Sequence, residues 1–257
     1  MNYVPAPSDI VGTRSIPDAP GKRAFDLVVA GMALILLGPL LLLAALAIKL
    51  TSRGPVLFVQ PRRGRNGRVF NIIKLRTLKH DRCDPPHLRD VRSVVENDAR
   101  VFPVGRFLRK RGLDEILQFW NVIRGDMSIV GPRPHALPHD DFFLVNVPGY
   151  AIRSTVKPGI TGLAQVSGCR GQIRSLNEAD RRVYFDLDYI DRASLTVDIG
   201  IVCKTVWIIL FGTDPKQPQA DEARLQPSVI MSLSPAPAIA PHELSGRSGE
   251  TWERAVE

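Results

Sequence analysis

Two adjacent carboxylates, Asp114 and Glu115, are the residues of this sequence whose type and spacing most directly suggest chemistry. Four cations precede them closely: Arg106, Arg109, Lys110 and Arg111. Neighbouring positive charges favour the ionised form of a carboxyl group, so we expect both carboxylates to keep a low pKa. Paired carboxylates can hold Mg²⁺, and one of them can attack phosphorus. An ordinary charged helix start explains the same pair, because acidic residues favour first turns.

A second feature is an arginine held between prolines, in Gly131-Pro132-Arg133-Pro134. Proline fixes φ on both sides of Arg133, which suits a preset phosphate ligand, although a structural turn has the same composition. Two further turn-like segments carry one cation each, Lys157-Pro158-Gly159 and Gly168-Cys169-Arg170-Gly171. Alone, neither segment indicates a function.

The charge of the chain is concentrated in one block. The 257 residues are 44% hydrophobic, and this hydrophobic content excludes a wholly disordered chain. The formal net charge is +8. Residues 49–113 hold 17 basic and 5 acidic side chains, a net charge of +12. Such a block predicts a polyanionic partner, whether nucleic acid, an anionic membrane surface or a phosphorylated substrate, unless it is only a solvated face. The three cysteines are far apart and indicate neither a zinc site nor a disulfide framework.

An apolar segment, residues 24–50, lies directly before this block and carries only two charges, Asp26 and Lys49. As a helix it is about 40 Å long, enough to cross a hydrocarbon core of about 30 Å. Pro39 predicts a kink or break near the middle, and basic residues flank both ends. A re-entrant hairpin with both flanks in the cytoplasm and a single kinked span are both compatible with this pattern. Lys22 and Asp26 stand four residues apart and can pair along one helix face.

The remaining sequence predicts a helix-rich α/β domain. Apolar runs at 56–59 and 69–75 flank Asn66-Gly67, which predicts a β-hairpin. We expect helices on either side of Gly112, a loop at 125–134, and a turn with a short extended segment at 157–168. Residues 176–192 have a helical pattern, and residues 195–211 form an apolar helix of the core or of the membrane interface. The predicted parts are a mobile leader (1–21), a membrane hairpin (22–52), a catalytic domain (53–212) and a disordered tail (213–257).

The order of motifs resembles the bacterial sugar transferase family of monotopic phosphoglycosyl transferases. The resemblance covers about residues 20–212. It rests on motifs in this order: Lys22-Arg23-x-Phe25-Asp26, the Pro-broken apolar segment, Lys74-Leu75-Arg76-Thr77, Leu113-Asp114-Glu115, Asn121-Val122, residues 125–134, residues 157–162, and Ala164-Gln165-Val166. It implies a monotopic fold, with an N-terminal re-entrant helix-break-helix and a cytoplasmic catalytic domain. Gly38-Pro39 stands where many members have Ser-Pro.

The resemblance also implies an activity: transfer of a sugar 1-phosphate from a UDP-sugar to undecaprenyl phosphate, with release of UMP, as the first membrane step of exopolysaccharide or related glycan synthesis. Asp114 is then the nucleophile that forms a phosphosugar–enzyme intermediate. Glu115 supports it, and both carboxylates bind Mg²⁺. The implied substrate-binding residues are Lys74, Arg76, Arg109, Arg133 and Arg170.

The implied location is the cytoplasmic face of the bacterial inner membrane, with no nucleic acid bound and a homodimer as one possible assembly. Glucose and galactose are the sugars suggested by resemblance. Two enzyme alternatives stay open, a different phosphorylated lipid acceptor and direct transfer without an intermediate. The alternative from another class is a membrane-tethered basic protein that binds nucleic acid or anionic lipid.

Overall fold

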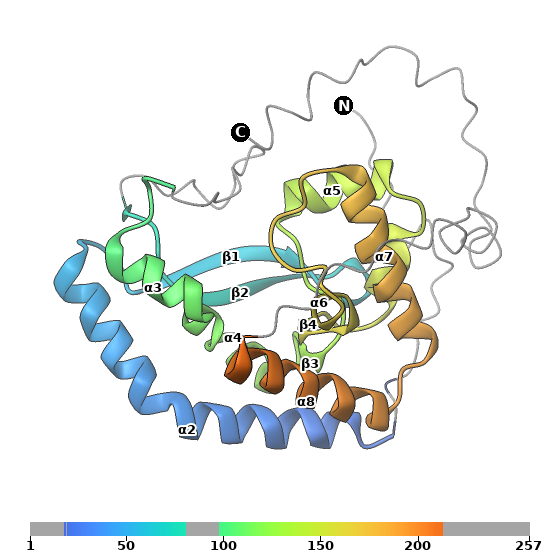
Figure 1. Cartoon of the computed structure of the whole chain (residues 1–257), viewed down its shortest axis with the longest axis horizontal. Helices are drawn as coiled ribbons and strands as arrows, with labels where there is room; N and C mark the ends of the chain where they lie inside the picture. Colours follow the sequence, from blue (N-terminus) through green and yellow to red (C-terminus); the bar gives the residue numbers. More distant parts are fainter. Residues whose placement is uncertain (1–17, 19, 81–97, 213–257) are drawn as a thin grey trace, which may run out of the picture.

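The computed structural model describes Asp18, residues 20–80 and residues 98–212. In this part of the chain, one long helix, α2 (Lys22–Thr51), runs along a domain of shorter helices and two two-stranded sheets (Figure 1). The helix-rich α/β class predicted from sequence is confirmed. The predicted tail and almost all of the predicted leader lie outside the described residues.

The first sheet is the predicted hairpin, β1 (Leu57–Arg63) and β2 (Val69–Leu75), paired antiparallel with Leu57 opposite Leu75. Its tip is a short 3₁₀ turn, η1 (Arg65–Gly67). Asn66 has a φ of 55° and Gly67 a φ of 74°, so the Asn-Gly pair supplies the left-handed backbone that closes the turn.

The two predicted helices around Gly112 are α3 (Pro103–Arg111) and α4 (Gln118–Arg124), with a 3₁₀ turn, η3 (Leu113–Glu115), between them. Gly112 ends α3 with a φ of 67°, and Gly125 ends α4 with a φ of 90°. Both are left-handed positions that glycine adopts without steric cost. The turn that carries the two carboxylates is therefore fixed between two well-defined helix ends.

The second sheet is parallel and joins the two glycine- and proline-rich motifs. β3 (Ser128–Val130) pairs with β4 (Gly159–Thr161). Residues 125–134 were predicted to be a loop throughout, and the short strand β3 inside that range corrects the prediction. A Cβ at Gly131 would overlap the main chain of Lys157, and a Cβ at Gly159 would overlap that of Gly131. The glycines are needed because the two chain segments touch backbone to backbone.

Four further helices and one 3₁₀ segment complete the domain: α5 (Leu137–Asn146), η4 (Tyr150–Thr155), α6 (Leu163–Val166), α7 (Leu176–Asp191) and α8 (Leu195–Phe211). Ser175 and Ser194 accept hydrogen bonds from main-chain N–H groups at the starts of α7 and α8. The main core lies between these helices and β3, with Val122, Met127 and Val183 fully buried.

Helix α2 continues through Pro39 without an interruption and bends along its course, so of the predicted kink or break the structure has a bend (Figure 1). Its N-terminal part contacts α4 and β3, and its C-terminal part contacts α3. Ile48, near its end, is fully buried in a second small core with Leu75 and Leu108. Both ends of α2 therefore pack on the same domain.

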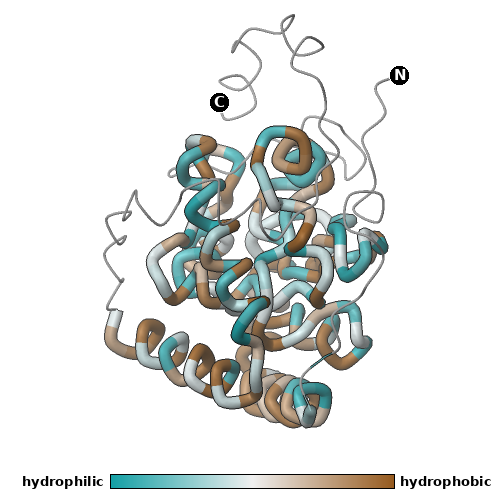
Figure 2. Tube along the Cα trace, turned by 90° about the vertical axis from the view of Figure 1, so that its right-hand side faces the viewer, coloured by the Kyte–Doolittle hydropathy of each residue, from teal (hydrophilic) through white to brown (hydrophobic). Residues whose placement is uncertain are grey.

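Between these ends, α2 exposes a large apolar surface. Ile35, Leu36 and Leu42 are each more than 70% exposed. The helix is long and apolar enough to cross a membrane by length and composition. Helix α8 adds exposed apolar residues, among them Trp207 and Phe211, and hydrophobic stretches lie along the lower edge of the molecule in Figure 2. An exposed apolar surface of this extent marks an interaction site with a membrane or another apolar surface.

Candidate active site

The carboxylates of Asp114 and Glu115 lie in η3, between α3 and α4, against strand β2. Asp114 is buried, with 6% of its surface exposed. Three of the cations named from sequence surround the pair: Lys74 from β2, Arg109 from α3 and Arg133 from the segment after β3. The fold thus gathers residues that are separated by up to 59 positions in the chain.

Glu115 is held by two of these cations. Lys74 Nζ donates to Glu115 Oε1 at 2.7 Å, and Arg133 Nη1 donates to Oε2 at 2.9 Å, while Arg133 Nη2 also donates to Oε1. Burial raises the pKa of Glu115, but the charges of Arg133 and Lys74 outweigh burial and hold the pKa well below its usual value. Glu115 is therefore ionised, as predicted from sequence.

Asp114 behaves differently. Burial raises the pKa of its carboxyl group, and the adjacent charge of Glu115 raises it further, against the lowering effects of Lys74 and Arg109. The expectation of a low pKa is therefore wrong for Asp114, because the fold buries this carboxyl group and pairs the neighbouring one. Within the described ranges Asp114 forms no ion pair. Its carboxylate is left available for a ligand.

A fourth cation at the site, Arg62, was not among the residues singled out from the sequence. Arg62 lies on β1, and its main chain forms an isolated bridge to Ala136, close to the Arg133 segment. Its Nη2 donates to Gln60 Oε1 at 2.7 Å, while its buried Nε has no hydrogen-bond partner. Burial, and then the charge of Arg133, lowers its pKa to about 10, against the charges of Glu115 and Asp140. The sequence signal that could have identified Arg62 was the two-residue alternation of side chains along the predicted strand.

The main chain at Arg133 is itself held by a buried polar network. Arg153, on η4, donates from Nη2 to the Arg133 carbonyl at 2.7 Å and from Nε to Asp186 at 2.7 Å. His135 Nδ1 lies 2.6 Å from the Tyr150 hydroxyl. Burial lowers the pKa of His135 well below its usual value, and the charge of Arg153 adds to this. These residues were not predicted as a group, because they come together only through the packing of η4 and α7.

Two residues implied as substrate ligands have other positions. Arg76 is buried away from the dyad: its Nη1 donates to Ser52 Oγ at 2.8 Å and its Nη2 to the Ser52 carbonyl at 2.9 Å, while Nε donates to the Pro55 carbonyl. Arg76 thus joins the end of α2 to the end of β2, and its role in substrate binding stays a prediction. Arg170 is exposed after α6, and its role stays a prediction.

The carboxylate donors fit Mg²⁺ only in part. Asp114 offers a carboxylate free of ion pairs, whereas both oxygens of Glu115 already accept hydrogen bonds from cations. No group of three or more potential metal-ligating side chains occurs among the described residues. Mg²⁺ keeps several waters and is commonly held by one or two carboxylates together with substrate phosphates, which matches this donor set. Asp114 is accordingly the first candidate ligand, and Glu115 would have to release a partner.

A buried carboxylate thus lies among four cations, in a domain that also carries a long apolar helix with an exposed middle. The model of the bacterial sugar transferase family matches residues 18–212, so the chain belongs to the bacterial sugar transferase family.

Three relatives illustrate the similarity. The chain is 51% identical over 185 residues to a UDP-glucose:undecaprenyl-phosphate glucose-1-phosphate transferase of Caulobacter vibrioides, covering 72% of this chain and 68% of the relative. It is 47% identical over 186 residues to the protein of the same description in Escherichia coli, covering 72% and 39%. It is 41% identical over 188 residues to the exopolysaccharide production protein PSS of Rhizobium leguminosarum, covering 72% and 92%. The chain thus matches well under half the length of some relatives and nearly all of others.

Proposed function

We propose that the chain transfers a sugar 1-phosphate from a UDP-sugar to undecaprenyl phosphate and releases UMP, as the first membrane step of exopolysaccharide or related glycan synthesis. The observation that carries the proposal is the buried Asp114 carboxylate, which pairs with no cation of the described residues, beside Glu115 and its paired cations. Family membership and the descriptions of the relatives support the same reaction class.

The charge of the site suits a diphosphate substrate. Four cations, Arg62, Lys74, Arg109 and Arg133, lie around the two carboxylates of the dyad, and Asp140 also acts on Arg62. A nucleoside diphosphate sugar carries two negative charges on its diphosphate. Cations that are already in place stabilise the charge that develops on a phosphoryl group during transfer. The positive charges of the site therefore suit the diphosphate.

In the proposed reaction, an oxygen of Asp114 attacks the phosphorus attached to the sugar. A new oxygen–phosphorus bond forms, the bond between that phosphorus and the bridging oxygen breaks, and UMP leaves with the electron pair. An oxygen of undecaprenyl phosphate then attacks the same phosphorus and releases the Asp114 carboxylate. Dividing the transfer in two lets the nucleotide leave before the lipid phosphate arrives. Glu115 keeps Lys74 and Arg133 in place during both steps.

Mg²⁺ bound at Asp114 would supply charge neutralisation to the diphosphate. Its requirement is tested by UMP release after exhaustive treatment with a chelator, followed by readdition of the ion.

The proposal places the catalytic domain at the cytoplasmic face of the bacterial inner membrane. Helix α2 is long enough to cross a membrane, yet both of its ends pack on one domain, which lies on one side of the membrane. This supports a re-entrant course, with the exposed middle of α2 in the lipid. Labelling of single cysteines placed near residues 2 and 60 in sealed vesicles should find both on the cytoplasmic side. An N-terminus on the opposite side would contradict the re-entrant course.

Glucose is the sugar we propose, from the descriptions of the Caulobacter and Escherichia relatives. UMP release from a panel of UDP-glucose, UDP-galactose and UDP-N-acetylgalactosamine tests it. The two enzyme alternatives stay open, a different phosphorylated lipid acceptor and direct transfer. A nucleic-acid-binding or lipid-binding protein is not favoured, because it leaves the dyad and family membership unexplained. Homodimer formation stays a prediction.

The central test is Asp114→Asn. The amide matches the carboxylate in size but is a very poor nucleophile, so we expect UMP release to fall to background and a labelled phosphosugar–enzyme species to disappear. Exchange of labelled UMP into UDP-sugar without lipid acceptor should occur in the wild type, because the first step is then reversible by itself. Full turnover by the variant would sink the mechanism, and absence of exchange in the wild type would favour direct transfer.

A further inference from the structure

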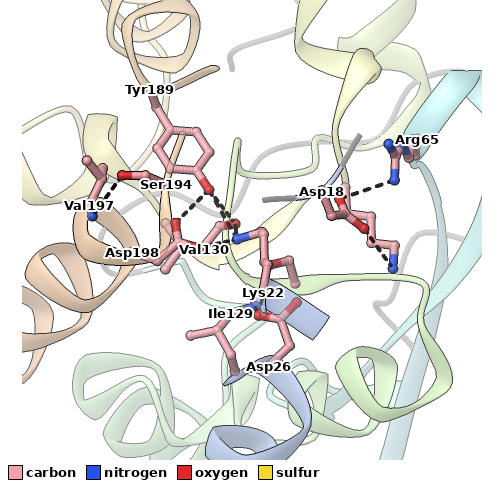
Figure 3. A network of polar contacts seen from close by, with 12 residues as sticks. Asp18, Lys22, Asp26, Arg65, Ile129, Val130, Tyr189, Ser194, Val197 and Asp198 are labelled. Atoms are coloured by element: carbon pink, nitrogen blue, oxygen red, sulfur yellow. Dashed lines mark hydrogen bonds and ion pairs between the residues drawn. The ribbon is translucent and has the colours of Figure 1, made fainter. Parts of the chain in front are cut away.

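The first two turns of α2 carry two buried charged side chains that take no part in the proposed chemistry, Lys22 and Asp26. The sequence suggested that they pair with each other. Instead, Lys22 Nζ lies 2.6 Å from Asp198 Oδ2, and Asp26 is bonded to β3 (Figure 3). Both side chains therefore have hydrogen-bond partners outside α2.

Both side chains bind the peptide groups of β3. Lys22 Nζ donates to the Val130 carbonyl at 3.1 Å. Asp26 Oδ1 accepts from the Ile129 N–H at 3.0 Å and from Ser128 Oγ at 3.0 Å. Tyr189, from α7, places its hydroxyl 3.2 Å from the Val130 carbonyl, close to Lys22 (Figure 3). The side chains of α2 thus act on one edge of β3 as a neighbouring strand would.

On the other edge of β3, the contacts are made by strand β4 and the residues next to it. The N–H of Ser128 donates to the Pro158 carbonyl at 2.9 Å, and the N–H of Gly131 donates to the Thr161 carbonyl at 2.9 Å. Gly159 N–H donates to the Pro132 carbonyl at 3.0 Å. The three residues of β3 are therefore fixed between α2 and β4.

Arg133 follows Val130 by only three residues, and Pro132 and Pro134 restrict the backbone between and beyond them. A displacement of β3 is therefore passed on to Arg133 and its hydrogen bonds with Glu115. A displacement of about 1 Å at a catalytic group can cost roughly 100-fold in rate. The start of α2 is in this way connected to the phosphate-binding side of the dyad.

We propose that Lys22 and Asp26 are positioning residues, which hold β3 so that the start of the apolar helix α2 and the Arg133 segment form one rigid unit. The proposal rests on the proposed function for its catalytic consequence. In this proposal the Lys22-Arg23-x-Phe25-Asp26 motif does more than anchor α2. It also fixes the position of Arg133, which contacts Glu115, relative to the membrane-facing helix.

Asp26→Ala is the informative variant. Lys22 is less suitable, because its removal leaves Asp198 buried without a counter-charge and can prevent folding. We expect Asp26→Ala to lower kcat for UMP release roughly 100-fold, with an unchanged membrane-bound fraction in liposome flotation. Asp26→Asn retains one acceptor oxygen and should recover part of the loss. Asp191→Asn, an exposed carboxylate at the end of α7, is the matched control and should leave kcat unchanged.

A double-mutant cycle separates positioning from general damage. If Asp26 acts through Arg133, Asp26→Ala should cost less than about threefold in an Arg133→Ala background, because the interaction it positions is already gone. Losses that multiply in the double variant would overturn the proposal. So would a loss of kcat that follows the membrane-bound or folded fraction.

Amide hydrogen exchange on the full chain in detergent gives a readout that does not depend on activity. Asp26→Ala should accelerate exchange in the peptide spanning residues 128–134 while leaving α5 unchanged. Unaltered exchange in this peptide would refute the rigid unit even in an active enzyme. If the wild type releases no UMP from any UDP-sugar, the proposed function fails, and faster exchange in the variant would still support the rigid unit.

Discussion

Arg62 is a residue of the site whose substitution should raise the stability of the protein and lower its activity. Burial, and then the charge of Arg133, lowers the pKa of Arg62 from its usual value to about 10, so keeping this charge in the folded protein costs free energy. At about 1.4 kcal/mol per pKa unit this difference corresponds to about 3 kcal/mol against folding. The side chain is only half-buried, and solvent screens part of this effect, so we expect roughly 1–2 kcal/mol to be measured.

Arg62→Met keeps much of the apolar stem and removes the charge. The unfolding free energy of the variant should therefore rise by roughly 1 kcal/mol, after allowing for the lost hydrogen bond to Gln60. A charged hydrogen bond to a phosphate contributes about 1.5–3 kcal/mol, so kcat/KM for UMP release should fall roughly 10- to 150-fold. The Arg62→Met variant should thus be more stable and less active than the wild type.

The measurements are denaturant unfolding of the purified chain in detergent and initial rates of UMP release with undecaprenyl phosphate. Arg68→Met is the matched control, because it removes the same charge from an exposed position of the same hairpin. The control should change neither quantity. A destabilised Arg62→Met variant whose activity loss equals its loss of folded protein would refute the reasoning, since Arg62 would then be a structural residue.

Two further predictions follow from the packing behind the Arg133 segment. His135 is buried with a pKa well below 6.5, so between pH 6.5 and that pKa the unfolded chain binds a proton that the folded chain does not, and stability falls as the pH falls. Between pH 6.5 and 5.5, His135→Gln should remove up to about 1.4 kcal/mol per pH unit of this loss of stability. The measurement is the unfolding free energy of the wild type and of the variant at each pH, and parallel curves for the two proteins would contradict the prediction. Gly131→Ala places a methyl group against the main chain of Lys157 and Gly159, and should cost about 1–3 kcal/mol in unfolding free energy and roughly 100-fold in UMP release. Gly200→Ala on α8, where a methyl group meets nothing within 4 Å, is its control and should be stable and active; equal effects of the two substitutions would argue against the close approach.

The sequence predicted local structure well where a single residue type decides the backbone. Asn66-Gly67 predicted the hairpin turn, and Gly112 the boundary between two helices, because both positions need a left-handed backbone. Pro39 predicted a kink or break in α2, and the helix stays continuous and bends along its course.

The site was predictable in part, for a different reason. Lys74 and Arg133 were implied by their motifs, and both contact Glu115. Arg76 lies in the same motif as Lys74 but follows the end of β2, where its guanidinium bonds Ser52 at the end of α2. The raised pKa of Asp114 depends on burial, and burial depends on how β2, α3 and α4 meet, which local sequence does not contain.

The backbone contact between β3 and β4 also limits how this enzyme can be redesigned. A Cβ at Gly162 would overlap the Gly131 carbonyl, just as those at Gly131 and Gly159 would overlap the facing main chain. The loop that presents Arg133 and the turn at Lys157–Gly159 thus cannot be remodelled independently. Protein engineers who seek a different sugar donor should therefore exchange residues 128–134 and 157–162 together, as a matched pair taken from one relative.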